Sequence, residues 1–207
     1  RYDTLTHTFR HTPIGDFNAH HYRYAPGRST FIVETDEASF ARAGFERMEE
    51  SESRGLCQKI FADALGGHPL ISNNSIWRRF PQVRNARWHH GKFVLIGDAL
   101  HTAHFSIGSG TRLAMEDAIA LDRALAAHSD DVAAALPAFE AARRPIVDKL
   151  LAGATASAAW YENFAGHMEL ARADFAMSYL TRSGRVDLDR LRKLSPRFVE
   201  RYERERS

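Results

Sequence analysis

The sequence has little cysteine, no long apolar run and almost no net charge. Cys57 is the single cysteine among 207 residues, so no disulfide can form within the chain, and we expect a reducing, cytoplasmic setting. No apolar run approaches the roughly 18 residues of a membrane-spanning helix, and no secretory signal pattern opens the chain. A formal charge of +2 is too small to indicate a nucleic-acid partner. These absences exclude a disulfide scaffold and argue against a membrane or nucleic-acid partner.

Metal ligands and hydrolytic nucleophiles are not arranged in a usual pattern either. His101 and His104 are three positions apart, but no carboxylate or thiolate set accompanies them at ligand spacing. Ser106 and Ser109 lie in a glycine-containing loop that does not form the Gly-x-Ser-x-Gly elbow of hydrolases. The sequence therefore predicts neither a metal site nor a serine hydrolase.

The first third of the chain predicts an antiparallel hairpin. Residues 17–24 and 29–35 are rich in aromatic and β-branched side chains, and Pro26 and Gly27 stand where a type II turn requires them. Alternation along a strand places two sets of side chains on opposite faces: His20, Tyr22 and Tyr24 on one, His21 and Arg23 on the other.

Helices are predicted for much of the remainder. Residues 50–65 form one amphipathic pattern, with Leu56, Ile60 and Ala64 on one face and two glycines after it. The chain after residue 110 is mostly helical by pattern, with Pro137 expected at a helix start and Pro145 at a kink or break. Residues 187–207 alternate basic and acidic side chains, which is typical of a solvated helical face. A phosphate contact for coenzyme A or a docking face for another domain is the alternative for this segment.

Residues 94–118 are the most informative part of the chain. A short apolar run over residues 93–96, predicted as a buried strand, ends in Gly97-Asp98 and passes through a loop containing Gly108 and Gly110. A helical pattern follows, with five apolar residues at helical spacing: Leu113, Ala114, Ala118, Leu121 and Leu125. This order predicts a strand, a glycine loop and a helix amino terminus.

Such a junction suits a polyhydroxylated, electron-rich ligand. Asp98 can accept hydrogen bonds from ligand hydroxyls, and Gly108 and Gly110 allow the backbone to approach a flat ring. The N–H groups of Thr111 and Arg112 at the helix start favour negative charge on the ligand. We interpret the nearby carboxylates of Glu116 and Asp117 as partners of the helix dipole rather than as a catalytic pair.

Residues 94–118, together with 139–145, resemble the second flavin-binding motif of single-component FAD-dependent aromatic hydroxylases. The resemblance implies FAD as cofactor, NAD(P)H as co-substrate and dioxygen as oxidant. It also implies a set of cofactor-binding residues, with Asp98 at the ribityl chain: Gly97, Asp98, His101, Gly108, Ser109, Gly110, Thr111 and Arg112.

Two departures narrow the resemblance. Phe105 and Arg112 stand where many members carry proline and asparagine. Residues 102–111, and also 29–35 and 175–183, resemble the branch acting on aryl-coenzyme A thioesters, such as salicylyl-CoA 5-hydroxylase and 2-aminobenzoyl-CoA monooxygenase. Tryptophan hydroxylases of violacein synthesis share some of this pattern. An aryl-CoA substrate is therefore expected, with a free indole or other small aromatic, or a non-catalytic flavin-domain remnant that binds a partner, as alternatives.

The resemblance also implies residues for substrate and chemistry. His104 and Phe105 are the candidates for the catalytic loop, and His20, Tyr22, Phe105 and Ile107 are those for contact with the aromatic substrate. His104 could accept a proton from a ring hydroxyl, or it could be a loop side chain bonded to backbone; the sequence leaves both open.

The overall expectation is an α+β chain that forms part of an FAD-dependent α/β monooxygenase fold. We assign residues 1–90 to a substrate-binding sheet, 91–127 to the flavin motif and 128–207 to a helical region. No Gly-x-Gly-x-x-Gly follows a first strand, so the usual site for the FAD pyrophosphate is absent from the sequence. We expect an amino-terminal dinucleotide-binding part to be missing, and residues 1–207 alone not to hold FAD tightly.

Overall fold

A computed structural model describes residues 3–129 and 131–206, which fall into two compact units. The first unit contains residues 3–78 and 161–175, and the second contains the other described residues. Helices and small antiparallel sheets occur together, which confirms the predicted α+β class. None of the described helices is long and apolar enough to cross a membrane.

The first unit is built on a three-stranded antiparallel sheet, in the order β1 (Thr6–Thr12), β2 (Gly15–Ala25) and β3 (Arg28–Thr35). The predicted hairpin of β2 and β3 is confirmed, and Gly27 adopts the positive φ of 69° that its turn requires. His21 is buried and stacks on Phe31, while Tyr22 is exposed. A register shift between Arg23 and Ala25 interrupts the predicted alternation before Tyr24.

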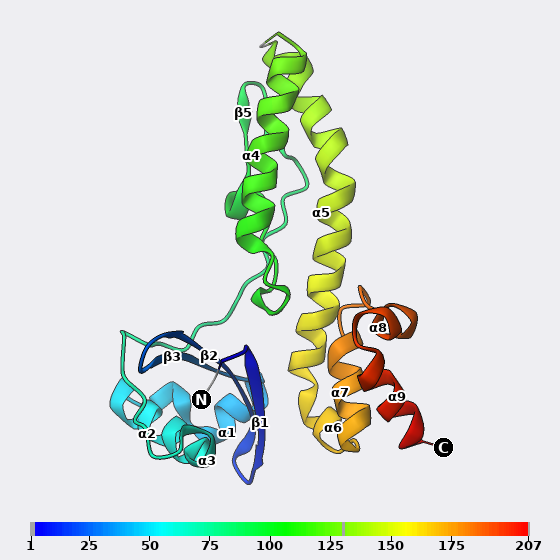
Figure 1. Cartoon of the computed structure of the whole chain (residues 1–207). Coiled ribbons are helices and arrows are strands. Elements are labelled where there is room, and N and C mark those ends of the chain that lie inside the picture. The colour runs from blue at the N-terminus through cyan, green and yellow to red at the C-terminus, as the bar shows by residue number, and fades with distance from the viewer. Residues whose placement is uncertain (1–2, 130, 207) are drawn as a thin grey trace. The chain divides into compact units, whose positions relative to one another are not determined.

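One face of this sheet is covered by short helices: α1 (Glu37–Ala43), η1 (Phe45–Arg47), α2 (Glu50–Ile60) and α3 (Ala62–Leu65) (Figure 1). The core between them contains Phe17, Ala19, Phe45, Cys57, Phe61 and Leu65, and the predicted face of Leu56, Ile60 and Ala64 packs against it. The helix expected at residues 50–65 is divided, because Phe61 leaves helical geometry and its ring is fully buried in this core. Phe9 of β1 makes two further aromatic contacts, one with Phe164 of α6 (Phe164–Met168) and one with Phe175.

The second unit contains the flavin-motif segment. Two strands of two residues each, β4 (His89–His90) and β5 (Phe93–Val94), form a hairpin. The short helices η2 (Gly97–Ala99) and η3 (Phe105–Ile107) come next, followed by the long helices α4 (Gly110–Ala127) and α5 (Val132–Glu162). Figure 1 shows α4 and α5 side by side. The core of this unit is formed by Trp88, Leu100, Leu113, Phe139, Val147 and Leu151. The glycine loop is thus followed by the helix predicted at that place.

Two predictions for this unit are wrong. The strand at residues 93–96 is not buried: β5 ends at Val94, and Phe93 is 82% exposed. A buried strand needs a neighbouring strand at each edge and packed layers on both faces, whereas in the described part of the chain β5 pairs with β4 alone. Pro137 does not mark a helix start, because it lies inside α5, which starts five residues before it. The helix also continues through Pro145, so of the two options for that residue the break is excluded and the kink stays a prediction.

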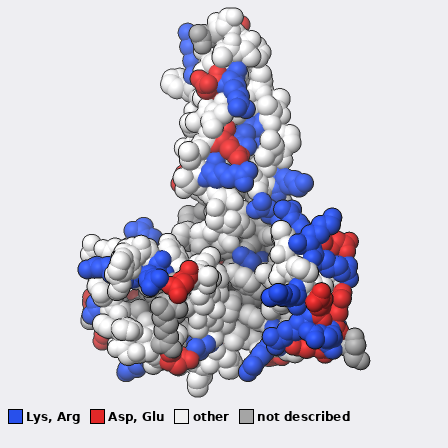
Figure 2. All heavy atoms as spheres, viewed as in Figure 1, with Lys and Arg blue, Asp and Glu red and all other residues white. Residues whose placement is uncertain are grey.

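The end of the chain contains α7 (Arg172–Thr181), α8 (Leu188–Leu194) and α9 (Pro196–Arg204). Basic and acidic side chains are interleaved over α8 and α9 (Figure 2), and Arg201 pairs with Glu205 one turn away. Only Leu191 and Val199 of these two helices are buried. The segment is helical and mostly exposed, as predicted, and the alternative of a phosphate contact or a docking face for it stays a prediction.

Candidate functional site

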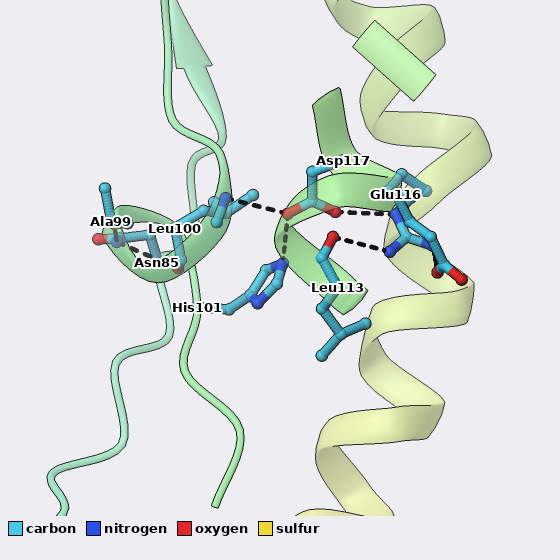
Figure 3. A network of polar contacts seen from close by, with 9 residues as sticks. Asn85, Ala99, Leu100, His101, Leu113, Glu116 and Asp117 are labelled. Carbon is cyan, nitrogen blue, oxygen red and sulfur yellow. Dashed lines mark hydrogen bonds and ion pairs between the residues drawn. The ribbon is translucent and has the colours of Figure 1, made fainter. Parts of the chain in front are cut away.

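A buried carboxylate anchors the flavin-motif segment. Asp117 of α4 is fully buried and makes three polar contacts (Figure 3). Its oxygens accept hydrogen bonds from the Gly97 N–H at 3.0 Å and from Arg143 Nε at 2.8 Å, and His101 Nε2 lies 2.9 Å away. The start of the motif, the loop after it and α5 therefore meet at one side chain.

The second half of this cluster is the guanidinium of Arg143, which is 4% exposed. It also pairs with Glu116 at 2.9 Å and donates to the Leu113 carbonyl at 3.2 Å. Burial by itself would raise the pKa of the Asp117 carboxyl, but His101, Arg143 and the Gly97 N–H outweigh it and hold that pKa below its ordinary value. The carboxylate is therefore charged at neutral pH and matched by a buried cation.

The interpretation of Glu116 and Asp117 as partners of the helix dipole needs correction. Neither residue lies in the first turn of α4, where the dipole acts. Arg143 is 26 positions from Asp117, and such a distant partner leaves no local signal in the sequence. The pairing explains why a carboxylate can be fully buried in this helix.

The loop between η2 and η3 is braced by the residues that precede β4. Thr102 exchanges hydrogen bonds with Val83, the Asn85 side chain donates to the Ala99 carbonyl at 2.8 Å, and Arg84 forms a β-bridge with His101. His101 is 3% exposed and so lies inside this brace rather than on the surface. The loop is therefore held on one side by backbone pairing and on the other by Asp117.

The three glycines of the motif have different structural roles. Gly97 has φ of 58°, and a Cβ there would lie 3.2 Å from the Ala114 Cβ, so this glycine allows the motif to pack closely on α4. Gly108 has φ of 59°, but a Cβ built on it or on Gly110 meets nothing within 4 Å. The backbone at Gly108 and Gly110 therefore borders open space and leaves room for a ligand.

Polar groups are exposed at both ends of this loop. The Asp98 carboxylate is exposed, and within the described residues it has no hydrogen-bond or ion-pair partner. Thr111 and Arg112 are exposed at the start of α4, where the first N–H groups have no acceptor within the helix. The Arg112 side chain is turned to Glu116, at 2.7 Å. An exposed carboxylate, open glycines and a helix amino terminus fit the ribityl hydroxyls and the electron-rich ring of a flavin.

The two candidates for the catalytic loop lie in an aromatic and polar cluster. Phe105 packs against Phe80 and His104, with ring centroids 4.6 and 4.4 Å apart. His104 Nδ1 contacts the Ser106 hydroxyl at 2.7 Å and accepts from the Ser106 N–H at 3.4 Å. This backbone bond is the second arrangement that the sequence left open for His104.

The same cluster continues through residues that the sequence did not indicate. The Ser106 hydroxyl meets that of the fully buried Ser157 at 2.7 Å, and Arg182 donates to both the Ser157 hydroxyl and the Ser106 carbonyl at 3.0 Å. Residues 104–106 are thus tied to α5 and to the end of α7.

Comparison with known proteins identifies the family of this chain. The model of the family described as FAD binding domain matches residues 17–154. The chain belongs to the FAD binding domain family. The resemblance inferred from the motif is confirmed, and the loop at Gly108 and Gly110 lies within the matched residues.

Named relatives of this FAD binding domain include three monooxygenases. The chain is 42% identical to salicyloyl-CoA 5-hydroxylase of Streptomyces sp over 88% of its own length. It is 40% identical to protodeoxyviolaceinate monooxygenase of Chromobacterium violaceum over 86% of its own length. It is 46% identical over 72% of the chain to 3-hydroxy-4-methyl-anthranilyl-[aryl-carrier protein] 5-monooxygenase of Streptosporangium sibiricum. The alignments cover 37%, 48% and 39% of those proteins, so the chain spans less than half of their length.

A solved structure shares the fold. The crystal structure of pqsL, a probable FAD-dependent monooxygenase from Pseudomonas aeruginosa, matches 79% of this chain and 47% of its own, with a TM-score of 0.54 and 23% identity. This likeness supports the assignment of the FAD binding domain to the fold of such monooxygenases.

The candidate substrate residues His20 and Tyr22 lie in the first unit, on the sheet face opposite α1, α2 and α3. His20 Nδ1 lies 2.7 Å from Glu34, and Asn18 donates to the same carboxylate at 2.9 Å. The cofactor residues and Ile107, which is half-buried, lie in the second unit. Glu34 and Asn18 were not indicated by the sequence, although alternation along β2 places Asn18 on the face of His20, and the register pairs Glu34 with Asn18.

Proposed function

We propose that this chain is the flavin-contacting and substrate-binding portion of an FAD-dependent monooxygenase that hydroxylates an activated aromatic ring. The open backbone at Gly108 and Gly110, in the loop that follows the exposed Asp98, is the observation that carries the proposal. FAD bound there would take electrons from NAD(P)H and activate dioxygen for transfer of one oxygen atom. The cysteine count remains the support for a cytoplasmic location.

Each candidate site residue has a separate role in this proposal. Asp98 holds ribityl hydroxyls, and the N–H groups at the start of α4 stabilise negative charge on the ring. Phe105 and Ile107 exclude water beside the reacting atoms. His104 positions the ring hydroxyl or amino group of the substrate, and His20 and Tyr22 contact the substrate from the sheet. The pyrophosphate requires a dinucleotide-binding segment that these residues do not contain.

The substrate that we propose is an aryl thioester. Two of the relatives carry a thioester in their names, one of coenzyme A and one of a carrier protein, and both are more than 40% identical to this chain. The match to protodeoxyviolaceinate monooxygenase favours a second candidate, an aromatic substrate that is not a thioester. Competition by free coenzyme A distinguishes them, because only a thioester enzyme binds it at the substrate site.

The test compares the chain with the same chain extended by its upstream coding region. We expect the extended protein to be yellow, to oxidise NAD(P)H and to convert salicylyl-CoA to a product 16 Da heavier by mass spectrometry. Asp98→Ala should lower its FAD content, whereas Asp122→Ala, an exposed carboxylate on α4, should not. An extended protein that stays colourless with added FAD would leave only a binding module.

A further inference from the structure

A cavity of about 390 Å³ lies in the first unit, and no residue assigned above to flavin or substrate lines it. Its walls are β3, α2 and residues 70–78. Small-molecule sites commonly have volumes of about 300 to 1,000 Å³. The cavity is therefore large enough for an organic ligand.

The wall formed by residues 70–78 is fastened to α2 by side chains. Three hydrogen bonds hold it: Leu70 N to Gln58 Oε1 at 3.0 Å, Trp77 Nε1 to Ser53 Oγ at 2.8 Å, and Ser72 Oγ to Glu50. These contacts set the distance between the segment and the helix, so the cavity is a built feature of the unit.

Apolar side chains line the interior and the rim. Phe31, Val33 and Trp77 pack against the core of the unit behind the cavity. Ile71 and Ile76 line it too, and they are 75% and 63% exposed. Exposed apolar side chains gathered at one opening are typical of a ligand groove.

Positive charge lies beside this apolar surface. Arg54, half-buried, and Arg78, exposed, both line the cavity, and in the part of the chain that the structure describes neither forms an ion pair. The one carboxylate in the lining, Glu50, is bonded to Ser72. Guanidinium groups without a carboxylate partner are suited to a phosphate.

We propose that this cavity binds the phosphopantetheine arm of a thioester substrate, with the phosphate at Arg54 and Arg78. The methylene and methyl groups of the arm would lie on Ile71, Ile76 and Val33, and its amides would meet the short polar side chains of the lining, such as Ser53 and Asn74. The inference rests on the proposed function in that the substrate is a thioester. Coenzyme A and carrier proteins present the same arm, so either can be the source.

The test measures binding to the purified chain by calorimetry, with coenzyme A, 4′-phosphopantetheine and phosphate-free pantetheine as probes. We expect phosphopantetheine to compete with coenzyme A and pantetheine to bind at least about tenfold more weakly, since it lacks the charged contact. Arg54→Gln and Arg78→Gln should each weaken coenzyme A binding about tenfold. Arg47→Gln removes the same charge from an exposed site outside the lining and should leave binding unchanged.

Absence of coenzyme A binding, or equal affinities of the Arg54, Arg78 and Arg47 variants, would overturn the inference. A phosphopantetheinylated aryl-carrier protein that displaces coenzyme A supports the site and assigns its source to a carrier. Failure of the proposed function gives a different result. If coenzyme A binding depends on the arginines but the protein never holds FAD, the binding site stands and the hydroxylase proposal is wrong. Conversely, if both arginine variants of the extended protein have an unchanged KM for salicylyl-CoA, the hydroxylase proposal stands and the binding site in the cavity is wrong.

Discussion

Replacing Asp117 by asparagine should destabilise the chain more than any exposed substitution on α4. The change removes the charge opposite Arg143, which is 4% exposed and keeps only Glu116 and the Leu113 carbonyl as partners. It also places an amide donor toward either the Gly97 N–H or Arg143, both of which are donors. Breaking a buried pair by removing one partner typically costs about 3 to 5 kcal/mol, a large part of the roughly 5 to 15 kcal/mol of a folded protein.

The assay is urea denaturation followed by circular dichroism at neutral pH, with Asp122→Asn as the matched control. Asp122 is an exposed carboxylate on the same helix, so its variant should change the free energy of unfolding by less than about 0.5 kcal/mol. Asp117→Leu combined with Arg143→Met should recover part of the loss, because an apolar pair leaves no buried charge. A loss below about 1 kcal/mol for Asp117→Asn, similar to the control, would refute the argument.

The pH dependence of the stability difference between the wild-type chain and Asp117→Asn is an independent test of the charge on Asp117. The folded-state pKa of Asp117 is lowered, so the stabilisation by its carboxylate is fully present above the unfolded-state pKa of about 4 and is lost as the pH falls through the folded-state value. The difference between the wild-type chain and Asp117→Asn should therefore shrink below about pH 4. A difference that grows on acidification would contradict the assignment of a charged carboxylate.

Three further predictions concern single positions. Gly108→Ala should cost about 1 kcal/mol in urea denaturation because Gly108 has φ of 59°, whereas Gly55→Ala, inside α2 with open space around it, should not destabilise the chain. Arg182→Met should accelerate hydrogen exchange at residues 104–108, because the Ser106 carbonyl loses its donor; Lys193→Met, exposed on α8, should leave it unchanged. Burial raises the pKa of the Cys57 thiol to about 11, so a disulfide reagent should modify it slowly at pH 8, faster toward pH 11 and at once in urea.

Local patterns were sufficient for several parts of this protein. Pro26 and Gly27 predicted the hairpin turn, since a type II turn depends on the φ values of its own two residues. The helix from Gly110 and the glycine loop before it were predicted from apolar spacing and from glycine, and the motif identified the family. Each of these signals lies within about 25 consecutive residues.

The residues that support the site depend on contacts between distant segments. Asp117 meets Arg143, Ser106 meets Ser157 and Arg182, and Gln58 holds Leu70; in each case the polar residue by itself has many possible partners. Burial of residues 93–96 and a helix start at Pro137 were predicted wrongly for the same reason, since strand pairing and helix packing decide both. The sequence by itself determined the motif and the family, because dihedral preference and hydrophobic period are local. Only the tertiary structure decided the buried ion pair, the braced loop and the cavity, because burial and charge pairing depend on which distant side chains meet.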